Sequence, residues 1–216
     1  VQKMAERGTL PGRKVGGGWK FPQAEIHHWL EERIGAADIA DLAAVEKVLT
    51  EAHQHGTYEI VNLFSLIPTG GIAVPLAAKT KSSVIAAMVD LAAETGLLWD
   101  TDKLTSAVRE RENLHPTALE NGVALLHPRR PLPQILAEPM VVLGLTPNGI
   151  PFGESRGVLT DIFFLICSTD DASHLRILAR LSRLITAEGF LPALRAASDA
   201  RAARDCLERF EQEVAG

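Results

Sequence analysis

The residues that decide the fold are 161–168, which read DIFFLICS. Every side chain from Ile162 to Cys167 is apolar, so the segment lacks the alternation of a strand with one solvent-facing side. An uninterrupted apolar run of this length is typical of a strand that is covered on both faces. Helices packed on both sides of a sheet provide that cover in α/β proteins. The segment therefore predicts a central strand in an α/β domain.

A long helix is predicted directly after this strand, over residues 171–187. Its inward stripe is His174, Leu178, Leu181 and Ile185, at i, i+4, i+7 and i+11. Working outward, strands are predicted at 72–76, 122–126 and 140–145, and helices at 81–95, 101–112, 191–197 and 199–214. The predicted fold class is α/β, with a mixed β-sheet sandwiched between helices.

Composition excludes several other classes of protein. The 216 residues are 46% hydrophobic and 23% charged, which is the balance of a soluble globular protein and argues against disorder. Two cysteines are too few for a secreted disulfide framework, so reduced thiols and a cytoplasmic location are expected. The longest uncharged run, residues 60–78, contains two prolines and two adjacent glycines that would break a spanning helix. No membrane insertion and no signal peptide are expected.

The N-terminal unit, residues 1–35, differs in charge from the rest. It carries six Lys or Arg and four Glu, a net charge of +2. Residues 36–216 carry 16 Lys or Arg and 23 Asp or Glu, a net charge of −7. A hairpin is predicted around the turn Gly16–Gly18, and a helix over 23–33. Residues 36–57 are predicted to be a helical linker, and 58–216 the main domain.

The order of elements in the N-terminal unit resembles part of a known DNA-binding fold. Residues 8–30, GTLPGRKVGGGWKFPQAEIHHWL, resemble the second half of an excisionase-type (MerR-like) winged helix-turn-helix. The resemblance makes them the end of a recognition helix, the wing and the following helix. The first helix and most of the turn would precede Val1, so the unit is partial and the chain is expected to be a fragment. A net charge of −5 argues against nucleic-acid binding by the whole surface.

Seven histidines are the first candidates for chemistry. His127 follows the strand 122–126, and the strand ends there because Pro128 cannot donate a hydrogen bond to the sheet. Ligands of open α/β sheets bind at the carboxyl ends of strands, which makes His127 a candidate; the alternative is an ordinary strand-end histidine. His174 begins the buried stripe of the 171–187 helix, where the positive helix end favours a nearby anion; the alternative is a core histidine bonded to a carbonyl. The four others on predicted helices lack the partner cysteines of a structural zinc site and are interpreted as surface or packing residues: His27, His28, His53 and His55.

Two longer stretches distinguish between these alternatives. Residues 109–127 read RERENLHPTALENGVALLH, and 149–185 read GIPFGESRGVLTDIFFLICSTDDASHLRILARLSRLI. The first resembles the active-site signature of IIA domains of the bacterial phosphoenolpyruvate-dependent phosphotransferase system, of the fructose/mannitol and nitrogen-regulatory class. The second is similar to that family's second signature, in which a strand leads to a helix with a second active-site histidine. The likeness covers roughly residue 58 to the C-terminus.

The resemblance implies a role for each matching residue. His127 would be the phosphorylated histidine and His174 the second histidine, with Arg111 of the Arg111-Glu112 pair beside the phosphoryl group. The family's threonine and the Asn before Gly fall on Thr117 and Asn121, which would donate hydrogen bonds. The family has Pro before the histidine and Gly after it, where this chain has Leu126 and Pro128, and Pro116-Thr117-Ala118 replaces its Ser-Thr-Gly.

The implied activity is that of a phosphohistidine carrier. It would accept phosphate from the histidine phosphocarrier protein on His127 and pass it to a IIB domain or use it for regulation, with no cofactor and no metal. The alternative is a transcription regulator in which the IIA-like body is a sensor with little or no transfer. No P-loop or dinucleotide fingerprint is present, because Gly16–Gly18 lacks the strand context and the Lys-Ser/Thr that follow such a loop.

Three further features are weaker candidates for a function. Asp170-Asp171 fits a helix cap better than a metal site. Arg129-Arg130 is either a solvated loop or a contact for the acidic rim of a partner carrier protein. His115 is interpreted as a loop histidine with no role.

Overall fold

A computed structural model of the chain describes residues 2–22, 25–26, 29, 62–114, 116–153 and 157–215. We call residues 2–29 the head and residues 62–215 the body. The predicted linker, 36–57, and most of the predicted helix 23–33 lie outside the described residues. The elements of the body are η1 (Phe64–Leu66), β3 (Ile72–Ala73), α4 (Lys81–Glu94), α5 (Thr101–Leu114), β4 (Val123–Leu126), η2 (Pro133–Ile135), β5 (Met140–Ile150), β6 (Thr160–Cys167), α6 (Asp171–Thr186), α7 (Phe190–Arg195) and α8 (Ala200–Ala215).

The body contains a four-stranded sheet in the order β3-β5-β6-β4. β3 is parallel to β5, β5 is antiparallel to β6, and β6 is parallel to β4. The predicted central strand is β6, which is hydrogen-bonded on both edges and buried along nearly all its length. The sheet is therefore mixed, as the sequence predicts.

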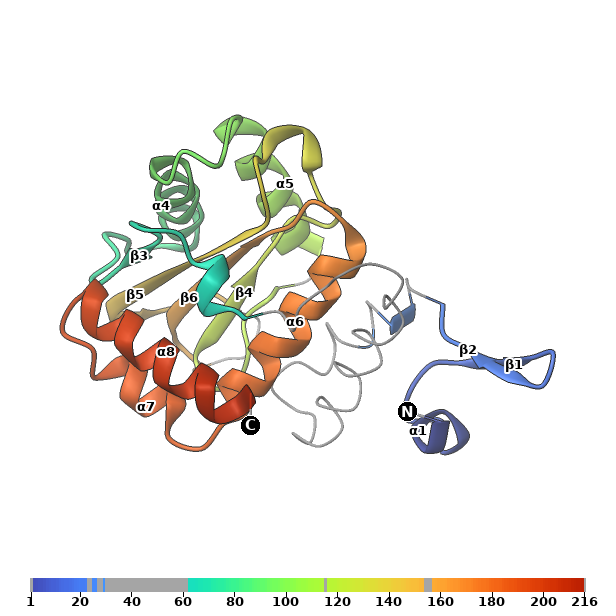
Figure 1. Cartoon of the computed structure of the whole chain (residues 1–216). Helices are drawn as coiled ribbons and strands as arrows, with labels where there is room; N and C mark the ends of the chain where they lie inside the picture. Colours follow the sequence, from blue (N-terminus) through green and yellow to red (C-terminus); the bar gives the residue numbers. More distant parts are fainter. Residues whose placement is uncertain are drawn as a thin grey trace.

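Two hydrophobic layers explain why β6 is apolar throughout. Alternate β6 residues Ile162, Phe164 and Ile166 pack in a layer with α6, α7 and α8. The intervening residues Phe163, Leu165 and Cys167 pack in a layer with α4 and α5. Figure 1 shows these two groups of helices on opposite faces of the sheet. The predicted α/β fold with a mixed sheet between helices is confirmed.

Two strands differ from their predicted bounds by more than one residue. β3 ends at Ala73 rather than residue 76, since Pro75 cannot donate to a ladder, although the Leu76 amide still donates to the Leu145 carbonyl at 2.6 Å. β5 continues to Ile150 instead of stopping at Leu145. A register irregularity between Leu145 and Ile150 accommodates Pro147 within the strand.

The head contains α1 (Gln2–Glu6) and a hairpin of β1 (Arg13–Val15) and β2 (Gly18–Lys20). Gly16 and Gly17 form the turn with φ of 60° and 82°, the left-handed values that a two-residue hairpin turn requires at both central positions. The predicted hairpin is confirmed, with Gly18 in the second strand rather than in the turn.

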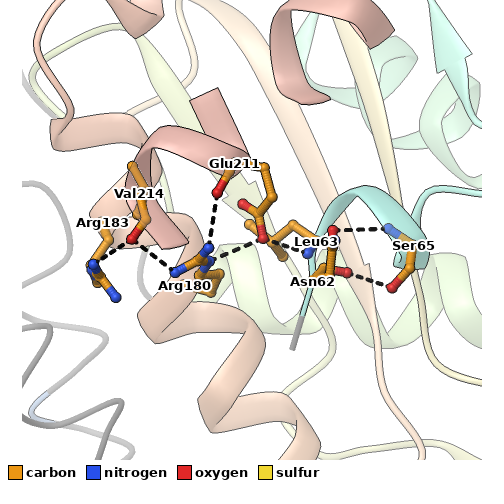
Figure 2. A network of polar contacts seen from close by, with 7 residues as sticks. All are labelled: Asn62, Leu63, Ser65, Arg180, Arg183, Glu211 and Val214. Atoms are coloured by element: carbon orange, nitrogen blue, oxygen red, sulfur yellow. Dashed lines mark hydrogen bonds and ion pairs between the residues drawn. The ribbon is translucent and has the colours of Figure 1, made fainter. Parts of the chain in front are cut away.

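A buried ion pair joins α6, α8 and the start of the body (Figure 2). Arg180, 2% exposed, donates from Nε to Glu211 Oε1 at 3.0 Å and from Nη2 to the Glu211 carbonyl at 3.1 Å. The same carboxylate oxygen accepts from the Leu63 amide at 2.9 Å. Arg180 and Arg183 also donate to the Val214 carbonyl near the end of α8. One carboxylate therefore fixes three segments that are far apart in sequence.

We expect Glu211→Ala to lower the free energy of unfolding by about 3–5 kcal/mol, because it leaves the Arg180 charge and the Leu63 amide buried without their acceptor. Gln212→Ala changes the exposed neighbour on the same helix and should cost less than about 0.5 kcal/mol. Urea denaturation of both variants measures this difference. Equal, small losses would show that the ion pair contributes little to stability.

Candidate active site

His127 lies at the end of the sheet where β4 and β6 finish. The two strands are parallel and adjacent, with Leu126 opposite Leu165, so their carboxyl ends meet at one edge. Val123 and Leu125 pack in the α6–α8 layer, and the alternation of the strand directs His127 toward the same side. The imidazole is 2% exposed. It is therefore a buried histidine at the edge where α/β sheets hold ligands.

Both ring nitrogens of His127 have a defined contact. Nδ1 lies 2.8 Å from the Leu125 carbonyl oxygen, which can only accept, so Nδ1 carries the proton. Nε2 is then the nitrogen with the lone pair, and it accepts a hydrogen bond of 3.2 Å from Nε of Arg111, in the last turn of α5. The nucleophilic atom is thus Nε2, beside a guanidinium.

His174 reaches the same place from α6. Asp170 caps this helix by accepting from the Ser173 amide at 2.9 Å, which places His174 in the first turn. Its Nδ1 lies 3.0 Å from the Ser168 hydroxyl, at the end of β6. The centroids of the His127 and His174 rings are 5.2 Å apart, and the rings are tilted by 51°. The two histidines, 47 positions apart in the chain, therefore converge.

Thr117 lies beside the site, but its donors are directed elsewhere. Its carbonyl accepts from the Leu125 amide, which places it along β4. Its hydroxyl and its amide both donate to Oε1 of Glu112, which is 1% exposed. Oε2 of the same carboxylate pairs with Lys81 Nζ at 3.0 Å, at the start of α4. Thr117 thus holds Glu112, the residue next to Arg111, and its hydroxyl is already used.

Asn121 lies outside the site, and its predicted place beside His127 is wrong. It precedes β4, whereas His127 follows it, and a four-residue strand separates its ends by about 13 Å. The Asn121 carbonyl accepts from Nη2 of Arg195 at 2.7 Å, and the same guanidinium forms a bidentate pair with Asp161. Asn121 therefore belongs to a cluster at the opposite end of the sheet.

The other candidates are resolved in part. Asp170 is the cap of α6, as predicted. Arg129 and Arg130 are exposed in the segment after His127. Among the described residues, no group of three or more His, Cys, Asp or Glu side chains could hold a metal ion. Other histidines lie outside the described residues: His27, His28, His53, His55 and His115.

The sequence interpretation missed two contributors. Ser168 contacts His174, and Lys81 pairs with Glu112, but neither carries a pattern that identifies it before the fold is known. Cys167, the neighbour of Ser168, is not a competing nucleophile, because burial raises its pKa to about 12 and keeps the thiol protonated. The arrangement can therefore perform nucleophilic chemistry at His127 Nε2 and stabilise an anion with Arg111.

Residues 65–210 match the family model for the phosphoenolpyruvate-dependent sugar phosphotransferase system, EIIA 2. This match covers more than half of the chain, and the chain belongs to that family. Residues 1–34 match a helix-turn-helix domain. Both resemblances seen in the sequence are thereby confirmed.

Curated relatives are fructose-specific proteins of the same system. The chain is 25% identical over 154 residues to the EIIABC component of Bacillus subtilis, covering 70% of this chain but only 24% of that protein. It is 24% identical over 151 residues to the EIIA component of Haloferax volcanii, covering 69% of this chain and 96% of that protein. The chain thus spans about a quarter of the Bacillus relative and nearly all of the Haloferax one.

Solved structures show the same fold. IIA mannitol from Escherichia coli aligns with a TM-score of 0.58 at 20% identity, over 64% of this chain and 96% of that one. The nitrogen regulatory protein IIA-Ntr of Neisseria meningitidis aligns with a TM-score of 0.59 at 18% identity, over 67% of this chain and 97% of that one.

None of the described helices of this chain is long and apolar enough to cross a membrane.

We expect Asp170→Ala to lower the free energy of unfolding by about 1 kcal/mol at pH 7, through loss of the α6 cap. Burial by itself raises the pKa of Asp170, but hydrogen bonds from Ser173 and Ala172 and the charge of Arg176 outweigh it and hold the pKa below its ordinary value. The contribution of a carboxylate with a lowered pKa is complete above its unfolded pKa, about 3.9, and is lost as pH falls through its folded pKa.

The measurement is urea denaturation of wild type and Asp170→Ala between pH 3 and pH 7. The difference between the two proteins should be constant above about pH 5 and shrink below about pH 4. Asp171→Ala, which changes the exposed neighbour, should cost only a few tenths of a kcal/mol. A difference that persists unchanged at pH 3 would contradict the ionised cap.

Proposed function

We propose that the protein is a phosphohistidine carrier of the phosphotransferase system. It accepts a phosphoryl group from the histidine phosphocarrier protein on Nε2 of His127 and passes it to a IIB domain, in the cytoplasm. The observation that carries this proposal is the convergence of His127, His174 and Arg111 at the carboxyl ends of β4 and β6. Family membership supports the general activity.

The transfer follows from the protonation of His127. The lone pair of Nε2 attacks the phosphorus of the donor, and the new N–P bond forms as the donor's N–P bond breaks. The proton stays on Nδ1, which continues to donate its hydrogen bond to the Leu125 carbonyl. No proton has to leave His127 before attack. The backbone carbonyl therefore orients the ring and selects the nitrogen that reacts.

Arg111 supplies the charge that the phosphorylated state needs. The added group carries about −1.5 to −2 charges. A guanidinium about 4 Å away contributes on the order of 4 kcal/mol per unit charge at an effective dielectric constant near 20, before desolvation is subtracted. Arg111 already contacts Nε2 and would turn to the phosphoryl oxygens. His174 is assigned to donate to the same oxygens while Ser168 orients its ring.

The relatives support the assigned partner and the general role. The chain has the fold of enzyme IIA of the E. coli mannitol system, solved in complex with phosphorylated enzyme IIB, with a TM-score of 0.57 at 19% identity, over 65% of this chain and 95% of that one. Curated relatives are named as fructose-specific components, which supports a sugar phosphotransferase role. A IIB-type domain is therefore the acceptor to test first.

A transcription regulator is the second candidate. The helix-turn-helix match at residues 1–34 favours it, and so does the basic hairpin with Arg13, Lys14 and Lys20. We assign residues 1–35 to a partial DNA-binding unit, 36–57 to a linker and 58–216 to the carrier domain. In the second candidate, the phosphorylation state of His127 would control the DNA-binding unit.

The deciding experiment incubates the chain with phosphoenolpyruvate, enzyme I and the histidine phosphocarrier protein, and then maps the phosphate. Label is expected on His127 and absent from His127→Gln. Label on another residue would refute the assignment. In cells, loss of sugar phosphorylation with unchanged promoter output in His127→Ala favours the carrier, and the reverse favours the regulator.

Arg111→Ala should slow phosphorylation of His127 about 10- to 100-fold, because a hydrogen bond from a charged donor is worth about 1.5–3 kcal/mol. Arg109→Ala removes the same charge from an exposed position one half-turn earlier on α5 and should leave the rate within about twofold. Rates of label transfer from the phosphocarrier protein compare the two. Equal rates would exclude Arg111 from the phosphoryl site.

A further inference from the structure

The two site histidines are closed off from other proteins. His127 is 2% exposed and His174 is 1% exposed. A phosphoryl donor has to bring its phosphorus within about 3–3.5 Å of Nε2 and in line with it. The nucleophile cannot be approached in this way while its ring stays buried. Transfer therefore requires part of the chain to move away from the site.

The head packs on the helix that carries His174. Leu175 and Ala179 of α6 form one hydrophobic cluster with head residues, and Phe21 packs against it. Leu175 follows His174 directly and is 2% exposed, while Ala179 is 0% exposed. Figure 1 shows the head on the side of the body where α6 lies. The remaining members of the cluster are Met4, Leu10, Ile26 and Trp29.

The geometry of α6 shows that this contact is separate from the core of the body. Leu178 and Leu181, on the stripe of His174, pack toward the sheet. Leu175 and Ala179 lie one position further along, about 100° around the helix from that stripe. All residues from His174 to Ser182 are nonetheless buried. A helix that is buried on all sides is covered by more than one part of the protein. The sheet covers the side of Leu178 and Leu181, and the head covers the side of Leu175 and Ala179.

Within the part of the chain that the structure describes, the segment that follows His127 is fixed to the body. The connection from β4 to β5 follows His127, and the Leu132 amide donates to the Ser168 carbonyl at 3.2 Å. Further along, the Trp99 amide donates to the Ile135 carbonyl and the Ala137 amide to the Leu97 carbonyl, each at 2.9 Å. Opening this connection breaks backbone hydrogen bonds. Separating the head from α6 exposes apolar side chains and leaves the body's sheet intact.

We propose that the face of α6 around Leu175 and Ala179 is a docking surface for the chain's own head, and that the docked head keeps the phosphorylation site closed to the phosphoryl donor. The inference rests on the proposed function of His127. It assigns the head a regulatory role toward the body, since docking and approach of the donor exclude each other.

Linkage makes the effect reciprocal. If docking disfavours phosphorylation, phosphorylation weakens docking by the same factor. The physical cause is the added volume and the charge of about −1.5 to −2 at a site that is closed when the head is docked. Phosphorylated protein therefore holds its head less firmly, and protein whose head is displaced is phosphorylated faster.

The first test uses Ala179→Glu in the full chain, which places a charged side chain in the docking surface while keeping a good helix former on α6. Ala196→Glu makes the same change at an exposed position at the end of α7. With labelled phosphocarrier protein as donor, Ala179→Glu should be phosphorylated at least about threefold faster than wild type, because the competent fraction rises. Ala196→Glu should match wild type.

Equal rates for all three proteins, with label on His127, would overturn the docking proposal and leave the carrier function standing. Absence of label on His127 in all three would refute the carrier function, and the docking proposal would fall with it. The two failures are thus distinguishable.

The second test needs no change in α6 and holds if Ala179→Glu does not fold. Hydrogen–deuterium exchange of the wild-type chain is followed before and after phosphorylation by the donor, with His127→Gln given the same treatment. Amides of residues 4–10 in the head should exchange faster in the phosphorylated wild type only. Unchanged exchange there would overturn the proposal.

Discussion

The site depends on the parallel pairing of β4 with β6. Their register, from Val123 opposite Ile162 to Leu126 opposite Leu165, ends both strands at one edge of the sheet. His127 leaves the first strand there, and the second leads through Ser168 to α6 and His174. A slip of one residue in β4 would turn its side chains to the opposite face and move His127 away from α6. The contact between the two rings therefore follows from strand register.

Much of the fold was predictable because hydrophobic patterns report burial directly. The run DIFFLICS predicts the central strand, and the stripe beginning at His174 predicts the inward face of α6; both are confirmed. β5 was less predictable, because Pro147 suggests an end to the strand and the bulge that accommodates it has no clear local signal. Pairing between strands that are distant in sequence decides such cases.

Only some of the predicted site residues lie together in the structure. His127, His174 and Arg111 were identified from the family signatures, and the structure brings them together. Asn121 belongs to the same signature but does not reach the site, because Asn121 precedes the extended strand β4 and His127 follows it. The Thr117 hydroxyl is directed to Glu112, which no spacing rule reveals. Ser168 and Lys81 become recognisable only when the helices are placed on the sheet.

The bond between Glu211 and the Leu63 amide has a consequence for competition between proteins. It fixes Leu63, at the start of the body, against α6 and α8, and α6 is also the helix on which the head packs. A ligand joined covalently to its site acts at an effective concentration that can reach the millimolar range. A partner diffusing freely has to compete with that local concentration, whatever the abundance of the protein. In the proposed docking, the ratio of closed to open molecules is thus an intramolecular constant, insensitive to expression level.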